Sequence, residues 1–317
     1  MLALVAASTA QLQPEALKAE DISRPNQVLK AEDISRPRVL GSNRCGGSTW
    51  VQRTARALLR AHGLVHWNGP FEFWDLIWHP NTHPWKESSS QDEFERVITM
   101  SGRNNSVLVL KVEPVAPSWA REMLRNKGAQ VILTTRENPL DNLICNVKDC
   151  FDPSKSGNDW GFPVNATTGE QSSLCFGARH LPKSVAQPKV LLHTANLSAA
   201  LAEYDAQLNR TVATWVQDGF ASDNLPVVTL EDLSVFQYTD GLDAGSVSEV
   251  SIAAWSKVMT AFGIKPDRAI ITDLLRPRAQ TVPPHSTADA VYNIEEVTSE
   301  LERLNRTDLL NHHAAVQ

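Results

Sequence analysis

Two short apolar runs in the middle of the chain have the length and pattern of buried strands. Residues 107–112 (VLVLKV) and 130–135 (QVILTT) are too continuously apolar for strands with one exposed face, which is typical of parallel strands covered on both sides. Between them, residues 117–128 (PSWAREMLRNKG) predict a crossover helix that ends at Gly128. The order strand, helix, strand predicts a parallel sheet.

The same alternation continues on both sides of these runs. An apolar piece, RVLGS, begins at Arg38 and leads into residues 48–63, which predict a helix ending at Gly63. One face of that helix is apolar and the other basic: Val51, Ala55, Leu58 and Leu59 against Arg53, Arg56 and Arg60. A helical stretch near 197–218 precedes a fourth predicted strand at 226–233. We therefore expect a three-layer α/β/α sandwich with a central parallel sheet, similar to P-loop nucleotide-binding proteins.

The first 37 residues have a different character. The nonapeptide LKAEDISRP occurs at residues 17–25 and again at 29–37. Two polar copies cannot stack into a solenoid, because a solenoid takes at least three repeats with a shared apolar face. We expect residues 1–37 to form a disordered linker and residues 38–317 to form the folded domain.

Charge and composition exclude some classes of function. The formal net charge of -6 gives no basic field for binding nucleic acid, and no apolar run reaches the roughly 18 residues of a membrane span. The four cysteines form neither a paired metal pattern nor a dense disulfide framework. The apolar start, MLALVAASTA, fits a truncated leader or an ordinary N-terminus equally well.

Five Asn-X-Ser/Thr sequons bear on the compartment. They stand at Asn104, Asn165, Asn196, Asn209 and Asn305. They favour the secretory route, with a Golgi enzyme or glycoprotein as the expectation, slightly over the cytoplasm.

Candidate chemistry begins with the loop GSNRCGGSTW at residues 41–50. Gly41 and Gly46 have the spacing of a phosphate-binding P-loop, but Gly47 stands where that loop requires lysine. A glycine-rich turn that opens into a helix offers unpaired amides and the positive end of the helix dipole to an anion. The missing lysine favours a ligand with one short anionic bridge rather than a triphosphate.

Two further groups follow the ends of predicted strands. Lys111 and Glu113 lie two residues apart and so on the same face of their strand. They could act as an electrostatic clamp and a general base, or they could form a surface ion pair. Arg136 follows the next strand and precedes a helix with Asn138 as N-cap and Pro139 at N1, where an arginine beside free amides would bind phosphate. All three junctions fall at one edge of the predicted sheet, which suits a ligand with two separated anionic groups.

Histidines and tryptophans near residues 65–85 offer alternatives. His66, His79 and His83 could act as bases, but Pro80 and Pro84 disfavour a helix that would align the last two on a metal. The tryptophan-rich segment is typical of packing and also of a substrate wall.

With these residues in view, the chain resembles the sulfotransferases. RCGGSTW is similar to their 5′-phosphosulfate loop, and TTRENPLDNLIC to their 3′-phosphate motif. VVTLEDL is similar to their YEDL strand, and the segment starting at Ser286 to a closing motif of many members. The resemblance covers roughly residues 38–304 and is thin between 151 and 198.

The resemblance implies a co-substrate, 3′-phosphoadenosine 5′-phosphosulfate, no required metal, and an acceptor that bears a hydroxyl on a glycan, a protein or a small alcohol or phenol. It implies Glu113 as the base, with Lys111 and Arg44 stabilising the transferred group. The implied donor site comprises Cys45, Gly46, Gly47, Ser48, Thr49, Trp50, Arg136 and Cys145.

The chain also departs from the family pattern. Cys45 stands where serine is usual in a loop one residue longer, and Cys145 stands where the 3′-phosphate serine is expected. A thiol is a poorer hydrogen-bond donor than a hydroxyl, so weaker phosphate binding would follow. Two other functions therefore stay open, a nucleotide kinase-like phosphoryl transferase and a non-catalytic secreted glycoprotein that retains the fold.

Overall fold

A computed structural model describes twelve segments of the chain. These are residues 35–42, 48–66, 87–99, 106–107, 109–112, 117–149, 159–171, 189–220, 225–234, 247–279, 285–310 and 313–314. They form a mixed α/β structure with a small parallel sheet and many helices, in agreement with the predicted class.

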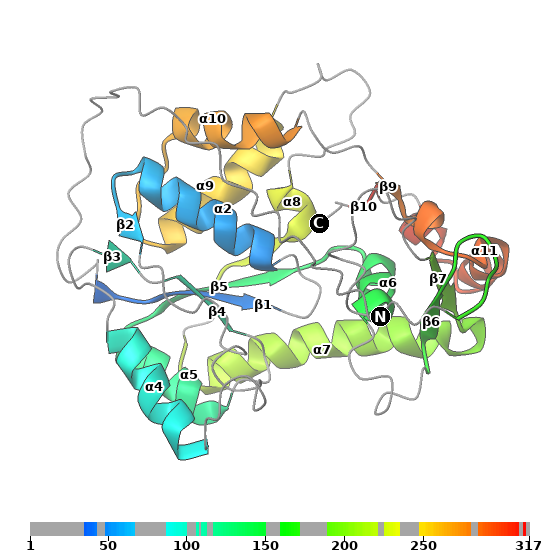
Figure 1. The fold of residues 1–317 in the computed structure, drawn as a ribbon, viewed down its shortest axis with the longest axis horizontal. Helices are drawn as coiled ribbons and strands as arrows, with labels where there is room; N and C mark the ends of the chain where they lie inside the picture. Colours follow the sequence, from blue (N-terminus) through cyan, green and yellow to red (C-terminus); the bar gives the residue numbers. More distant parts are fainter. Residues whose placement is uncertain are drawn as a thin grey trace, which may run out of the picture.

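Four parallel strands form the central sheet in the order β4, β1, β5, β8 (Figure 1). Their bounds are β4 (Val109–Val112), β1 (Arg38–Ser42), β5 (Gln130–Thr135) and β8 (Val227–Thr229). β1 is an interior strand, because Gly41 lies opposite both Val112 of β4 and Leu133 of β5. Since the strands are parallel, their carboxyl ends lie at one edge of the sheet.

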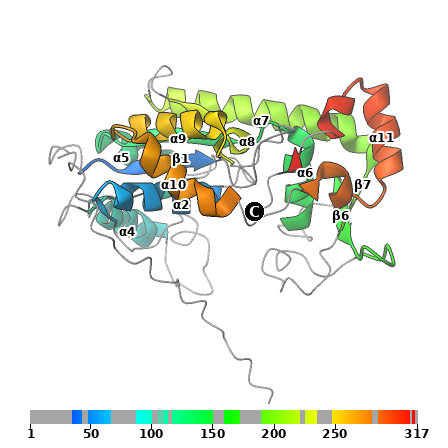
Figure 2. The ribbon, with the colours of Figure 1, turned by 90° about the horizontal axis from the view of Figure 1, so that it is seen from above.

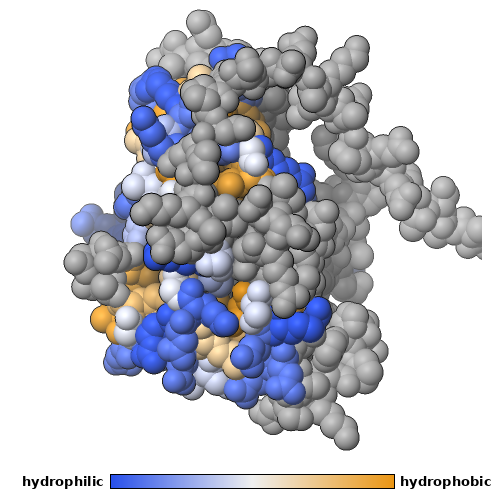
Figure 3. All heavy atoms as spheres, turned by 90° about the vertical axis from the view of Figure 1, so that its left-hand side faces the viewer, coloured by the Kyte–Doolittle hydropathy of each residue, from blue (hydrophilic) through white to orange (hydrophobic). Residues whose placement is uncertain are grey.

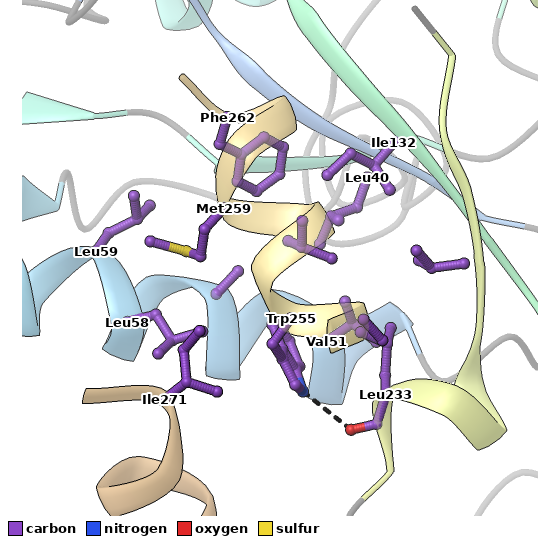
Figure 4. Packing of buried hydrophobic residues seen from close by; sticks show 14 of the residues in the cluster. Leu40, Val51, Leu58, Leu59, Ile132, Leu233, Trp255, Met259, Phe262 and Ile271 are labelled. Atoms are coloured by element: carbon purple, nitrogen blue, oxygen red, sulfur yellow. Dashed lines mark hydrogen bonds between the residues drawn. The ribbon is translucent and has the colours of Figure 1, made fainter. Parts of the chain in front are cut away.

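One face of the sheet is covered by three helices, which lie above it in Figure 1. They are α2 (Ser48–Ala61), α9 (Glu249–Ala261) and α10 (Arg268–Ala279). Leu40 and Ile132 point from the sheet into this cluster, where Trp255 of α9 is fully buried (Figure 4). The indole Nε1 of Trp255 donates a 2.9 Å hydrogen bond to the carbonyl of Leu233, which satisfies its polar atom inside an apolar core.

Three other helices pack on the opposite face. They are α4 (Glu87–Thr99), α5 (Ser118–Asn126) and α7 (Leu197–Gln217). Val39, Val131 and Leu133 point from the sheet into this second cluster, together with Trp215 of α7. Neighbouring residues of β5 thus enter different clusters, which explains why the run is apolar without alternation.

A third apolar cluster lies beyond the carboxyl edge of the sheet. Its apolar side chains come from α6 (Pro139–Asp149), β7 (Lys189–Leu192), η5 (Thr287–Ala290), α11 (Ile294–Arg303), η6 (Thr307–Leu310) and the first turns of α7. β6 (Gly161–Val164) and η3 (Thr194–Asn196) flank β7 in the chain. β6 and β7 pair antiparallel. Figures 1 and 2 both show α7 running from the sheet to this cluster. Its first half packs here through Leu197 and Leu201, and its second half packs under the sheet through Trp215.

Two predicted strands differ from the structure. Residues 107–112 divide between β3 (Ser106–Val107), which pairs with β2 (Val65–His66), and β4. The predicted strand at 226–233 stops at Thr229, and α8 (Leu230–Leu233) follows. The Thr229 hydroxyl accepts a 3.0 Å hydrogen bond from the amide of Asp232, so it caps a helical turn and ends the strand. β9 (His285–Ser286) and β10 (His313–Ala314) complete the described strands.

The described surface carries few large apolar side chains. Figure 3 views the end of the molecule at the left of Figure 1, where hydrophilic residues surround smaller hydrophobic areas. Among the described residues, the exposed large hydrophobic side chains are those of Val216 on α7, Val250 on α9 and Tyr292, which precedes α11. No helix in the described segments is long and apolar enough to cross a membrane.

Gly41, the first glycine of the predicted loop, lies within β1 and has a packing role. A Cβ built on it would lie 2.5 Å from Cδ2 of Leu133 and 3.4 Å from the indole of Trp215. The absence of a side chain lets α7 approach the sheet closely. Packing therefore explains this glycine without any ligand.

Replacing Gly41 by Ala should lower the free energy of unfolding by about 1–3 kcal/mol, because the added methyl overpacks a filled site. Denaturant unfolding measures the loss. In a Leu133→Val background, which removes the clashing Cδ2, the same replacement should cost less. Equal losses in both backgrounds would contradict this explanation.

Candidate functional site

The carboxyl edge of the sheet brings the three predicted junctions onto adjacent strands. β1 leads to residues 43–47, β4 carries Lys111 and leads to Glu113, and β5 leads to Arg136. Leu40 lies opposite Lys111, and Ser42 lies opposite Thr134. The prediction that these strands end at one edge is confirmed by their parallel register.

Some of the predicted site residues lie outside the described part of the chain. These are Arg44, Cys45, Gly46, Gly47 and Glu113, together with His79 and His83. Ser48 and Thr49 begin α2, and Lys111 lies in β4; their backbones alone are described. The roles assigned to these residues stay predictions.

Arg136 lies in the turn between β5 and α6. The residue is 5% exposed, so a guanidinium charge is held in the interior at the end of the sheet. A buried charge requires charged or hydrogen-bonding neighbours. The groups around this turn therefore determine which interactions a bound anion could make there.

The hydroxyl of Tyr204, on α7, fixes the backbone of the turn. It donates a 2.6 Å hydrogen bond to the carbonyl of Arg136 and accepts one of 3.1 Å from the amide of the same residue. The side-chain oxygen of Thr135 lies 2.8 Å away. Because the single phenolic proton goes to the carbonyl, Thr135 is the donor to Tyr204. Burial raises the pKa of Tyr204, which keeps this hydroxyl neutral.

Asn138 caps α6 as the sequence predicts. Its Oδ1 accepts hydrogen bonds from the amides of Leu140, at 2.9 Å, and Asp141, at 3.4 Å. Its Nδ2 donates a 2.9 Å bond to the carbonyl of Leu309, which ties the cap to the third cluster.

The cap overturns the expectation of free amides beside Arg136. Pro139 has no N–H, and the amides of Leu140 and Asp141 already donate to Asn138. The amide of Glu137 donates a 2.8 Å bond to Oε2 of Glu231. An anion at this turn would therefore interact mainly with the Arg136 side chain, or compete with Glu231 for one amide.

Glu231, on α8, brings a half-buried carboxyl to the turn. Its Oε1 is buried and, among the described residues, has no hydrogen-bond partner. Burial raises the pKa of this carboxyl, which the amide of Glu137 and the charge of Arg136 partly oppose. The protonated form is therefore more accessible than in an ordinary glutamate.

Asp141 and Lys148 of α6 complete the charged groups at this site. Asp141 is 3% exposed and accepts a 2.7 Å hydrogen bond from the hydroxyl of Thr287. Burial lowers the pKa of Lys148, with Asp141 opposing the shift and Arg136 adding to it. The cluster thus combines two cations with two carboxyls, of which Arg136 and Asp141 are buried and Lys148 and Glu231 half-buried.

Trp50 and Cys145 take part in structural interactions. Trp50 is half-buried and makes an edge-to-face contact with Trp255, with ring centroids 5.7 Å apart. Cys145 is disulfide-bonded, and the other cysteines all lie outside the described segments. In this state Cys145 carries no S–H proton with which to contact a phosphate.

Comparison of the chain with models of protein families, with curated proteins and with solved structures finds no match. Within the described segments, no cluster of His, Cys, Asp and Glu side chains could hold a metal ion. The site is therefore interpreted from its own residues.

Tyr204 and Glu231 were missed as site residues in the sequence. Glu231 lies in VVTLEDL, but that run predicts a continuous strand rather than a capped turn. Tyr204 lies in a helix 68 residues from the backbone that it binds, so no local pattern indicates the contact.

Replacing Tyr204 by Phe should lower the free energy of unfolding by about 1–3 kcal/mol, because buried polar groups of the turn lose their partner. Thermal or denaturant unfolding measures it. Tyr292→Phe is the matched control, since Tyr292 is 40% exposed and its loss should stay within about 0.5 kcal/mol. Equal effects of the two replacements would show that the Tyr204 hydroxyl does not stabilise the turn.

Glu231→Gln should change the pH dependence of stability. The pKa of the Glu231 carboxyl is higher in the folded protein than in the unfolded chain. The wild-type protein therefore becomes less stable than the variant as the pH rises from the ordinary pKa of a glutamate to this raised pKa. The variant should therefore have the higher Tm at pH 7, and the two proteins should converge near pH 4. Glu137→Gln, at an exposed position of the same turn, should show no such gain. A Glu231→Gln protein that is less stable than wild type at pH 7 would refute the unfavourable burial of this carboxylate.

Proposed function

We propose that this chain is a sulfotransferase that transfers a sulfuryl group from 3′-phosphoadenosine 5′-phosphosulfate to an acceptor hydroxyl. The proposal includes a three-layer, P-loop-like fold around the parallel sheet. Its main support is the adjacency of β4, β1 and β5, since each of the three candidate anion-binding or catalytic junctions follows the carboxyl end of one of these strands.

The donor has two anionic ends, and the edge offers two places for them. The 5′-phosphosulfate would lie at the start of α2, against Arg44 and the amides of Gly46, Gly47, Ser48 and Thr49. The 3′-phosphate would lie against Arg136, which follows the neighbouring strand. Cys145 is in a disulfide, and the first amides of α6 already donate to the side chain of Asn138. Arg136 is therefore the main group that would bind this phosphate.

The reaction would be an in-line displacement at sulfur. Glu113 would take the proton of the acceptor hydroxyl as its oxygen forms a bond to sulfur, while the bond from sulfur to the bridging phosphate oxygen breaks. Lys111 and Arg44 would stabilise the charge that develops on the bridging oxygen. The products are a sulfated acceptor and adenosine 3′,5′-bisphosphate.

A non-catalytic protein that retains this fold is the second candidate. It is favoured by the structure around α6, where Asn138 and Glu231 use the amides that a phosphate could take and Cys145 is in a disulfide. The two candidates differ in whether the donor binds.

Calorimetric titration with adenosine 3′,5′-bisphosphate, in the presence of a chelator, tests the donor site. We expect micromolar binding that Arg136→Ala weakens by about 10- to 100-fold, since hydrogen bonds to a charged group contribute about 1.5–3 kcal/mol. Arg276→Ala, at an exposed position of α10, is the control and should bind as wild type. Because Arg136 is buried, the Tm of each variant is compared first. Absence of binding by folded wild type would favour the non-catalytic candidate.

Once an acceptor is identified, Glu113→Gln should lower turnover by about 10² to 10⁴ and leave the affinity for adenosine 3′,5′-bisphosphate unchanged. Steady-state kinetics and calorimetry on the same preparation separate the two effects. Unchanged turnover would remove Glu113 from the role of base.

A further inference from the structure

We infer that Glu231 makes anion binding at Arg136 proton-linked: a phosphate or sulfate group that binds there compels the Glu231 carboxyl to take up one proton from solvent. The inference rests on the proposed function for the identity of the larger ligand, but simple anions test it as well. It assigns a specificity role to a residue of α8 that has no part in the transfer step.

The hydrogen bonds of the turn single out Glu231. The amide of Arg136 donates to the hydroxyl of Tyr204, and the first amides of α6 donate to the side chain of Asn138, so their acceptors are neutral groups. The amide of Glu137 instead donates to a carboxylate oxygen of Glu231. Glu231 is thus an internal anion at the turn, in the region that a ligand phosphate would share.

The charges around the turn make a second anion costly. Within the cluster, Arg136 and Asp141 both act electrostatically on Glu231, and the same two residues act on Lys148 of α6. A phosphate or sulfate would add one or two negative charges beside two carboxyls, in partly buried surroundings that screen charge less than bulk water does. Proton uptake by one carboxyl is the simplest way to relieve that repulsion.

Glu231 rather than Asp141 is the group that should take the proton. Asp141 accepts a hydrogen bond from Thr287 and stands in the first turn of α6, a helix of 11 residues whose dipole favours a negative charge. Glu231 stands in the first turn of α8, which has 4 residues and therefore a weaker dipole. The Glu137 amide, which an anion at this turn would share, already donates to Oε2 of Glu231, and the buried Oε1 of Glu231 has no hydrogen-bond partner among the described residues. Protonation at Oε1 leaves the bond at Oε2 in place.

The test is calorimetric titration of wild type, Glu231→Gln and Glu137→Gln with two probes, adenosine 3′,5′-bisphosphate and inorganic sulfate. Each titration is run between pH 6 and 8 in two buffers of different ionisation enthalpy, which gives the number of protons taken up. Sulfate is useful because its own charge is constant in this range. Glutamine can still accept the Glu137 amide, so the variant retains the turn.

We expect wild type and Glu137→Gln to take up as much as one proton more than Glu231→Gln with either probe. The affinity of wild type for sulfate should fall by up to about tenfold per pH unit, and that of Glu231→Gln should stay level.

Equal proton uptake by all three proteins would overturn the inference and leave the donor site standing. Sulfate binding with the expected linkage, but without bisphosphate binding, would support the inference and overturn the proposed function. Binding of neither probe would overturn both.

Discussion

The hydroxyl of Tyr204 joins the two halves of the described structure. α7 packs at one end under the central sheet and at the other end against α6, β7 and α11 (Figure 2). In the sequence, Tyr204 lies between Leu201, which packs in the third cluster, and Trp215, which packs under the sheet. Its hydroxyl holds both backbone polar groups of Arg136 at the point where the chain leaves β5 for α6. The position of the buried arginine thus depends on a helix that begins 61 residues later.

The buried charges at the turn limit what the site can do. Arg136 places one cation at the turn, Glu231 and Asp141 add two carboxyls near it, and Asn138 uses amides that a helix N-terminus normally offers. A ligand must therefore compete with groups of the protein itself. Such competition costs affinity, and it also makes binding responsive to the ligand's charge and to pH.

The sequence predicts the elements with local patterns well. The whole of β5, the apolar face of α2 and the cap at Asn138 are found as expected, because each is determined by neighbouring residues. The predictions were wrong where a distant partner or a single side chain decides. Thr229 turns a predicted strand into a helical turn. Gly41 has a packing role against Leu133 and Trp215 that its spacing to Gly46 does not indicate. The partners of Arg136 come from α7 and α8, which no spacing near β5 could indicate.

The most direct test of the central claim is a crystal structure of the protein with adenosine 3′,5′-bisphosphate. The proposed site predicts the 5′-phosphate at the start of α2 and the 3′-phosphate within hydrogen-bond distance of the Arg136 guanidinium, with the nucleoside crossing the ends of β1 and β5. A ligand bound away from the carboxyl edge of the sheet, or with neither phosphate near Arg136, would contradict it.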